Sequence, residues 1–193
     1  MHALPAAPAP APRRQLFVGT AVACAAIATL YGGMVALFLR FRQSTLAVPE
    51  SEWKPADVIV PEVATNNMLI AFLAVFVFAQ WAVYAARRDN RSHVGLSLGL
   101  VGLIAIAIVN GQAFVYRQMD LGVRDGTYQT FFYALTGTFL VLMIAGLVFT
   151  FVTAFRFLGG RTRDREIVSA HAMFWYFIGA VYSILWFVVY VTK

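Results

Sequence analysis

Three histidines and one cysteine are the side chains of this sequence that could bind a metal ion through an imidazole or a thiolate. His2 and His93 lie outside the long apolar segments, whereas His171 lies about one turn into the last of them. A haem held between helices needs an axial His or Met deep within a membrane segment, usually with a second ligand opposite. His171 has no histidine partner in another apolar segment, and no Cys, His, Asp and Glu residues show metal-site spacing. We therefore expect this chain to bind no cofactor or metal, with a haem-binding enzyme as the alternative.

Asp, Glu, Lys and Arg side chains could carry protons or ions, but all of them lie outside five long windows. Proton and ion paths through membranes are usually lined by ionisable residues. We therefore do not expect this chain to transport ions alone, and a stand-alone channel or transporter is kept as an alternative that flux in liposomes would reveal. The uncharged windows are Leu16–Leu39, Val63–Ala86, Val94–Tyr116, Gly126–Phe155 and Ile167–Thr192.

Uncharged polar side chains do occur inside these windows. In a membrane such groups usually form hydrogen bonds between helices, worth roughly 0.6 to 2 kcal/mol each. We favour this structural role over a ligand site for the following residues: Gln80, Asn110, Gln112, Thr136, Thr138 and Ser183.

The elements that position these residues follow from composition. Hydrophobic residue types make up 61% of the 193 residues and charged types 12%, whereas soluble domains are about half apolar and a quarter charged. Each window exceeds the roughly 20 residues that span a bilayer as a helix, and the period-two alternation of a membrane β-barrel is absent. A single cysteine, Cys24, excludes an intrachain disulfide. The predicted fold is an all-α integral membrane protein with five transmembrane helices, at about 16–39, 66–86, 94–116, 128–155 and 167–191.

Two further segments complete the predicted organisation. Residues 1–15 are expected to form a disordered Pro/Ala-rich tail, and 16–193 the membrane domain. Arg13-Arg14 before an apolar run could be a twin-arginine export signal, but the run is long and four more follow, so we favour a first membrane helix. The connection Phe41–Asn67 carries three prolines and is expected to be extended along the membrane surface, with Trp53 at the interface.

Lys and Arg residues are distributed unequally between the two sets of connections. Such residues favour the cytoplasmic side of a membrane. Because they lie between apolar runs here, the basic charge indicates membrane topology, and we expect no nucleic-acid binding. We expect a cytoplasmic N-terminus and an external C-terminus, with the inverted orientation as the alternative. The favoured cytoplasmic side holds Arg13, Arg14, Arg87, Arg88, Arg91, Arg156, Arg161, Arg163 and Arg165, against Arg40, Arg42, Lys54, Arg117, Arg124 and Lys193.

Small and aromatic residues recur at helical spacing and mark candidate contacts. Small side chains let membrane helices approach closely. In the last window Tyr176, Gly179, Tyr182 and Trp186 share one helix face, which could contact a partner helix, lipid or another part of this chain. The candidate helix-packing or lipid-contact residues are Gly19, Gly33, Gly99, Gln112, Gly137, Gly146, Trp175, Tyr176, Gly179 and Tyr182.

Local motifs from Gly19 to Tyr190 resemble subunit III of the haem–copper (cytochrome c) oxidases, in the five-helix form found in many bacteria. The most specific match is Thr130–Gly137 followed by Gly146-Leu147, which resembles the fourth helix of that family. The other matches are Gly19-Thr20 with Gly33 in the first helix, Ala86-Arg87-Arg88-Asp89 after the second, Gly111-Gln112 with Tyr116 in the third, and Trp175 with Tyr190 in the last.

The sequence departs from this family pattern at its buried polar positions. The family's acidic residue in the first helix falls on an isoleucine here, the Glu of the third helix on a valine, and the two histidines of the fourth on Phe and Leu. In the last helix its His and Asp fall on Tyr and Gly. We therefore carry over the fold and the place in a complex, but no role that depends on those carboxylates and imidazoles. The replaced positions are Ile27, Val115, Phe139, Leu142, Tyr176 and Gly179.

The resemblance implies a non-catalytic accessory subunit of an aerobic respiratory-chain oxidase. Such a subunit binds no haem or copper, which reside in partner subunits. It packs against catalytic subunit I, with subunit II in the same complex, and holds membrane lipids between its first two helices and the remaining bundle. The implied location is a bacterial cell membrane. A related accessory subunit of a nitric oxide reductase is the alternative within this resemblance, and the electron donor stays undetermined.

Overall fold

The computed structural model describes residues 14–56, 58–123, 125–160 and 165–192. These residues form five helices long and apolar enough to cross a membrane, and no strand occurs among them. The predicted all-α, five-helix membrane fold is therefore confirmed. Of the tail expected over residues 1–15, residues 1–13 lie outside the described residues. The helices are α1 (Gln15–Leu46), α2 (Glu62–Arg87), α3 (Arg91–Met119), α4 (Thr127–Leu158) and α5 (Arg165–Leu185), and α5 continues as a π-helical end, η1 (Trp186–Val191).

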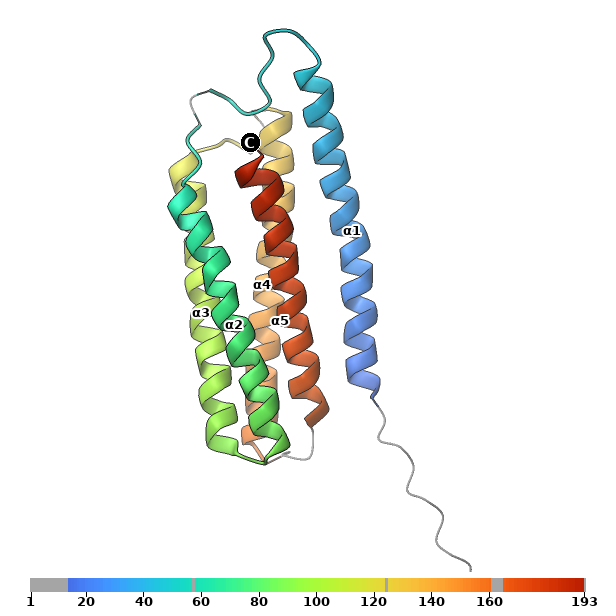
Figure 1. Cartoon of the computed structure of the whole chain (residues 1–193), viewed down its shortest axis with the longest axis vertical. Coiled ribbons are helices and arrows are strands. Elements are labelled where there is room, and N and C mark those ends of the chain that lie inside the picture. Colours follow the sequence, from blue (N-terminus) through green and yellow to red (C-terminus); the bar gives the residue numbers. More distant parts are fainter. Residues whose placement is uncertain (1–13, 57, 124, 161–164, 193) are drawn as a thin grey trace, which may run out of the picture.

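Helix α5 occupies the centre of the bundle (Figure 1). It packs against α1, α2 and α4, while α3 packs against α2 and α4. Short connections make α2, α3, α4 and α5 antiparallel neighbours in chain order. The long connection after α1 instead crosses one end of the bundle, so α1 lies beside α5 and α4 rather than beside α2.

Helix α1 contacts the bundle through a narrow seam. Its fully buried residues, Cys24, Tyr31 and Phe38, follow one another at intervals of seven, the spacing that keeps one face of a long helix against a partner. Hydrogen bonds hold both ends of the seam, one to the start of α5 and one to the residue that follows η1. Glu166 Oε1 accepts from the backbone N–H of Phe17 at 2.9 Å, and Arg42 Nη2 donates to the carbonyl oxygen of Thr192 at 2.6 Å.

The connection predicted to extend over Phe41–Asn67 is shorter than expected. Helix α1 continues to Leu46 and α2 begins at Glu62, so the irregular part covers only residues 47–61. The reason is that polar side chains outside the bilayer do not stop a helix, whereas proline restricts the residue before it and ends one. The helical structure accordingly ends shortly before Pro49 and resumes after Pro61.

Helix α3 has clear local start and stop signals. Asn90 lies at its N-cap and accepts a hydrogen bond from the backbone N–H of His93 at 3.2 Å, as asparagine commonly does there. Asp120 ends the helix in the left-handed conformation with φ 43°. Asp89, in the turn before α3, accepts a hydrogen bond from Arg165 at 2.7 Å and so links this turn to the start of α5.

Candidate functional site

One face of α5 contacts α2 along most of its length. Tyr176 donates to Gln80 Oε1 and Tyr182 to the carbonyl oxygen of Thr65, each at 2.8 Å. Gly179 allows this approach, because a Cβ at that position would collide with Phe76. Trp186, farther along the same face, donates to Asn66 Oδ1 at 2.8 Å. From the sequence, this face could have contacted a partner helix, lipid or another part of the chain. In the structure it contacts another helix of the same chain.

Helices α4 and α5 meet at Gly146 and Trp175, two of the predicted helix-contact residues. An ideal Cβ on Gly146 would lie 3.0 Å from Trp175 Cζ2 and 2.9 Å from Ile178 Cδ1. Beside them, Trp175 Nε1 donates to His171 Nε2 at 2.9 Å, and the Thr150 hydroxyl lies 2.8 Å from the same nitrogen. His171, Thr150 and Trp175 are all buried, so His171 takes part in an internal hydrogen-bonded cluster that the sequence did not predict.

A second buried polar cluster joins α3, α4 and η1. The Tyr190 hydroxyl lies 3.3 Å from both Nε2 and Oε1 of Gln112, and both residues are buried. One turn farther along α3, Tyr116 donates to the Thr136 hydroxyl at 2.8 Å, which itself donates to the carbonyl oxygen of Phe132. Gln112 and Thr136 thus make the hydrogen bonds between membrane helices that we expected of uncharged polar residues.

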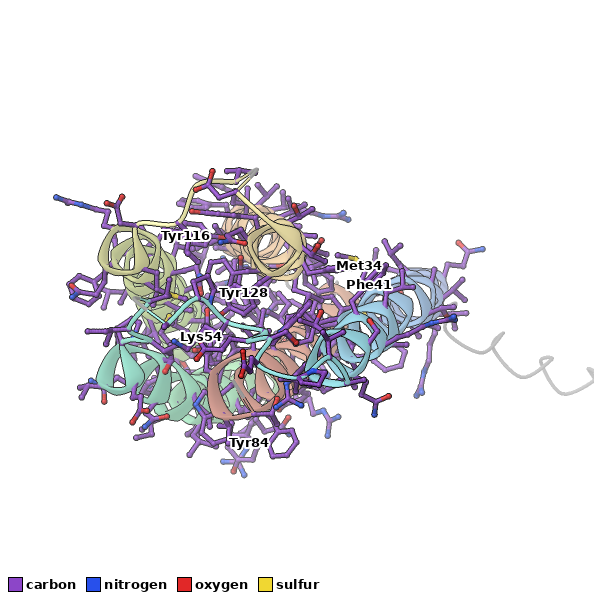
Figure 2. All side chains as sticks on the ribbon, turned by 90° about the horizontal axis from the view of Figure 1, so that it is seen from above. Met34, Phe41, Lys54, Tyr84, Tyr116 and Tyr128 are labelled. Carbon is purple, nitrogen blue, oxygen red and sulfur yellow. The ribbon has the colours of Figure 1, made fainter. Side chains whose placement is uncertain are left out.

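An aromatic cluster closes the end of the bundle beneath the long connection. Trp53 packs edge-on against Phe38, with ring centroids 5.2 Å apart, and against Tyr128 at 5.8 Å. Seen from above, Tyr128 and Lys54 lie over the middle of the bundle (Figure 2). Trp53 is only 5% exposed, so its ring packs within the protein, while its position at the depth of the membrane interface stays a prediction. The sequence offered no periodic signal for it, because Trp53 lies in irregular chain.

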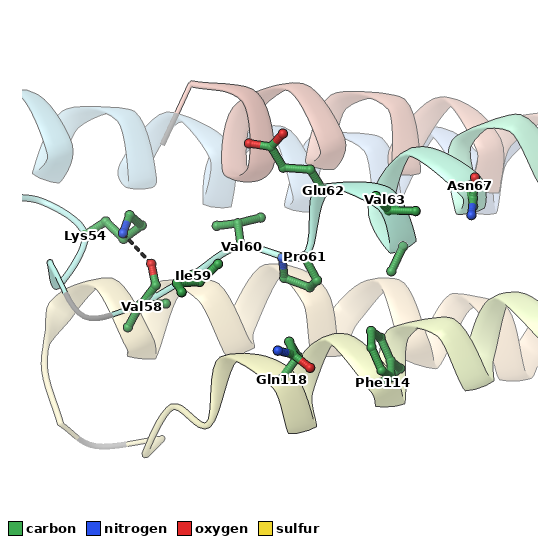
Figure 3. Close-up of a pocket in the computed structure, with 11 residues that line it drawn as sticks. Lys54, Val58, Ile59, Val60, Pro61, Glu62, Val63, Asn67, Phe114 and Gln118 are labelled. Atoms are coloured by element: carbon green, nitrogen blue, oxygen red, sulfur yellow. Dashed lines mark hydrogen bonds between the residues drawn. The ribbon is translucent and has the colours of Figure 1, made fainter.

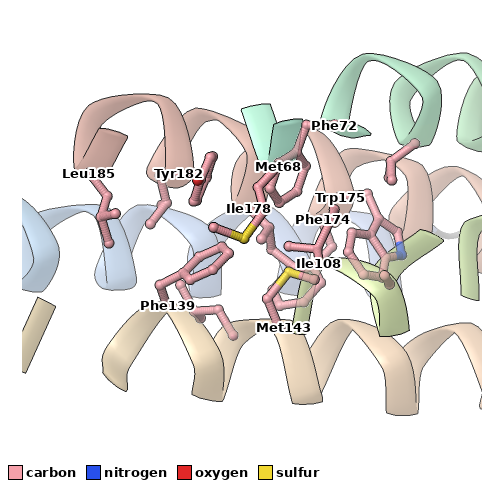
Figure 4. Close-up of a cluster of buried hydrophobic side chains, with 14 of the residues drawn as sticks. Met68, Phe72, Ile108, Phe139, Met143, Phe174, Trp175, Ile178, Tyr182 and Leu185 are labelled. Atoms are coloured by element: carbon pink, nitrogen blue, oxygen red, sulfur yellow. The ribbon is translucent and has the colours of Figure 1, made fainter. Parts of the chain in front are cut away.

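The positions where the resembling family has buried polar residues are filled with apolar packing. Val115, Phe139 and Leu142 are buried. The ring of Phe139 lies 5.0 Å from that of Tyr182 and 6.2 Å from that of Phe72. Figure 4 shows these rings in one cluster with Met143 and Ile178. This part of the interior offers shape complementarity and no group that could exchange a proton at neutral pH.

Four candidate glycines make no close contact inside the chain. An ideal Cβ on Gly19, Gly33, Gly99 or Gly137 would meet no atom within 4 Å. These positions therefore remain candidate contacts to lipid or to a partner protein. Gly146 and Gly179 differ, because each lies directly against a neighbouring helix.

A pocket with a volume of about 850 Å³ lies beside the long connection. It is lined by residues on both sides of Pro61, and by Phe114 and Gln118 of α3 (Figure 3). Its one lysine, Lys54, donates to the carbonyl oxygen of Val58 and to that of Pro55, which fixes the loop. Among the described residues, no group of three or more His, Cys, Asp and Glu could hold a metal ion.

Comparison with known proteins gives one consistent result. A family model described as "Cytochrome c oxidase subunit III" matches residues 27–193. Proteins named "Cytochrome c oxidase subunit 3" are similar to this chain in Synechocystis sp. (23% identity, covering 89% of this chain and 73% of the relative), Rhizopus stolonifer (28%, 81% and 58%) and Struthio camelus (27%, 79% and 61%). The chain thus spans less than two thirds of the length of the Rhizopus and Struthio relatives.

Proposed function

Because the chain belongs to the cytochrome c oxidase subunit III family, we propose that it is a non-catalytic accessory subunit of a respiratory haem–copper oxidase. In this role it packs against the catalytic subunit and stabilises it in the membrane. The observation that carries the proposal is the match over residues 27–193. Haem and copper belong to the partner subunits in this proposal.

The chemical types of the buried side chains favour a structural role over proton conduction. The described membrane helices bury uncharged polar side chains, one histidine and aromatic rings, whereas proton paths need ionisable groups along their length. Gln112 and Thr150 each use their polar atoms to bind a neighbouring helix. We infer that the chain contributes shape and stability to the complex.

The proposed setting is a bacterial plasma membrane with the N-terminus of α1 in the cytoplasm. In the described chain, the end that holds the start of α1 and α3 carries Arg14, Arg87, Arg88 and Arg91, which favours the cytoplasmic side. The expected partners are catalytic subunit I and its neighbour subunit II. Lipids at the candidate glycines Gly19, Gly33 and Gly137 belong to the same proposal.

The test is isolation of the full-length chain from its native membrane in a mild detergent, through a tag at its N-terminal tail. The eluate is examined by a reduced-minus-oxidised haem spectrum and by mass spectrometry of all co-isolated chains. Haem bands together with an oxidase catalytic subunit are expected. An unrelated tagged membrane protein from the same cells is the control for carry-over of abundant respiratory complexes.

The identity of the co-isolated haem protein separates the two accessory roles. A catalytic subunit that reduces oxygen supports the proposal. A nitric oxide reductase in its place would assign the chain to the alternative complex, and a colourless preparation without a partner would overturn both. In that last case, ion or solute flux in liposomes would become the assay of choice.

A further inference from the structure

An apolar groove of about 450 Å³ lies between α3 and α4, on the side of the bundle away from α1. Glycines and aliphatic residues of α3 form one wall, and α4 supplies the other. Its one hydroxyl, that of Thr150, donates to the carbonyl oxygen of Gly146 and binds His171 in the interior. The groove therefore offers no free hydrogen-bonding side chain and suits hydrocarbon. Its lining residues are Gly95, Leu98, Gly99, Gly102, Leu103, Ile106, Leu147, Thr150, Phe151 and Ala154.

Two of the three glycines that line this groove, Gly99 and Gly102, are not explained by packing of the two helices, whereas Gly95 lies against Leu158 of α4. A Cβ on Gly99 would meet no atom within 4 Å, and one on Gly102 would reach only the Thr150 methyl group at 3.9 Å. By contrast, Gly146 lies directly against α5. The space above Gly99 is thus vacant within the chain, and a side chain there would fill the groove rather than strain the bundle.

The length of the groove matches one leaflet of a bilayer. From Gly95 to Ile106 the helix rises about 16 Å at 1.5 Å per residue, and half of a hydrocarbon core is about 15 Å. A transmembrane helix of a partner protein would need a groove across the full core. The groove instead starts one turn after the N-terminal end of α3 and reaches only about half-way along that helix. The acyl chain of one lipid would cover the same length.

A basic side chain lies at the mouth of the groove. Arg91 is the first residue of α3 and lies one turn before Gly95 on the same helix face. It is exposed, and it forms no ion pair within the described chain. The two described carboxylates at this end are engaged elsewhere, Asp89 by Arg165 and Glu166 by the N–H of Phe17. Arg91 is therefore available to a phosphate group.

We propose that the α3–α4 groove binds an anionic phospholipid, with an acyl chain over Gly99 and Gly102 and the phosphate against Arg91. The combination of an apolar groove one leaflet deep and an arginine at its membrane-surface end fits this ligand class. The site is separate from any lipid held between the first two helices and the bundle. It does not depend on which redox complex the chain joins.

Native mass spectrometry of the tagged complex tests this proposal, with the lipids released from each species identified by fragmentation. The parent protein is expected to retain one anionic phospholipid at this site. In Gly99→Leu the leucine displaces two or more methylene groups of the acyl chain, so occupancy should fall about tenfold. In Arg91→Gln the preference for anionic over zwitterionic lipid should fall about fivefold. Gly102→Leu gives a second groove-filling variant should Gly99→Leu fail to fold.

Ala145→Leu is the matched control, because Ala145 is exposed on α4 but does not line the groove. Unchanged lipid occupancy in folded Gly99→Leu and Gly102→Leu would overturn the proposal, and so would an equal loss in Ala145→Leu. Loss of a partner subunit with the lipid retained would show that a protein covers the groove. If no partner protein is found but the lipid occupancies of the variants are as expected, the result supports the lipid site and contradicts only the proposed function.

Discussion

His171 lies between Thr150 and Trp175, and its Nε2 atom is engaged by both. A histidine is the first residue to suspect as a haem ligand in a membrane helix. Here the surrounding contacts give the ring a different task, since it accepts a hydrogen bond from Trp175 one turn along α5 and meets α4 through Thr150. At the scale of single residues, the protein uses polar side chains to join helices.

Replacement of His171 distinguishes this structural role from a cofactor role. In His171→Leu the Trp175 N–H loses one of its acceptors, so the complex should lose about 1 kcal/mol of stability. A thermal unfolding series in detergent measures the loss, and the haem content per complex should equal that of the parent. Haem content that falls in proportion to the substitution, in a protein that stays folded, would contradict the structural role.

Glycine substitutions separate positions that are packed from positions that are open. Gly146→Leu would force a side chain into Trp175 and Ile178, and overpacking of this kind costs typically 1–3 kcal/mol. Gly137→Leu would enter open space and should leave the stability of the isolated chain almost unchanged. Thermal unfolding of both variants checks this contrast. Equal destabilisation would mean that the α4–α5 contact at Gly146 is less close than described.

Among the five long helices, α1 makes the least contact with the rest of the described chain. It buries Cys24, Tyr31 and Phe38 and is held at its ends by Glu166 and Arg42. Between these two hydrogen bonds, its outer face is open to lipid or to a partner. The two end contacts are therefore expected to decide how firmly α1 stays on the bundle.

Reactivity of Cys24, the only cysteine of the chain, reports whether α1 is docked. Hydrogen bonds to charged groups are worth about 1.5–3 kcal/mol. Loss of one in Arg42→Ala should raise the population of undocked α1, and with it the rate of Cys24 modification by a small thiol reagent, about tenfold. The double variant with Glu166→Ala should react faster still.

Arg40→Ala is the matched control on the same helix, because Arg40 is exposed and forms no ion pair within the described chain. Its Cys24 should react at the parental rate. If Arg40→Ala and Arg42→Ala accelerate the reaction equally, the effect comes from general charge at that end and not from the bond to Thr192.

The elements themselves could be predicted from charge-free windows, because burial of a charge in lipid is costly and the bilayer sets the helix length. The helix ends could not, since α1 continues to Leu46 in polar surroundings until proline stops it. The partner of the Tyr176–Tyr182 face was also undetermined. Its 3–4-residue spacing shows a common face, but only the three-dimensional arrangement places α2 there and moves α1 away.

At the scale of the whole molecule, the sequence contained the family likeness but not the internal sites. Motifs such as Thr130–Gly137 indicated the fold, and the match over residues 27–193 shows the family. The His171–Thr150–Trp175 cluster joins residues from two helices, and the Trp53 cluster includes irregular chain. Contacts of this kind depend on packing, which periodicity within one helix cannot report.

The molecule as a whole is a bundle with an open helix at one side, and its described residues bury no Asp, Glu, Lys or Arg. Its central helix, α5, is hydrogen-bonded to α1, α2 and α4. Every buried polar group discussed above serves helix packing. The central claim of the proposed function is that this chain supports a haem protein without holding the haem itself.

The most direct measurement of that claim is to take the isolated complex apart and ask where the haem goes. A stronger detergent separates this chain from its partners, each fraction is recorded by optical spectroscopy, and the fractions are then mixed again. The account predicts a folded, colourless fraction containing this chain, all haem with the partner, and recovery of the complex on mixing. Haem that stays with this chain and disappears in His171→Leu would contradict it.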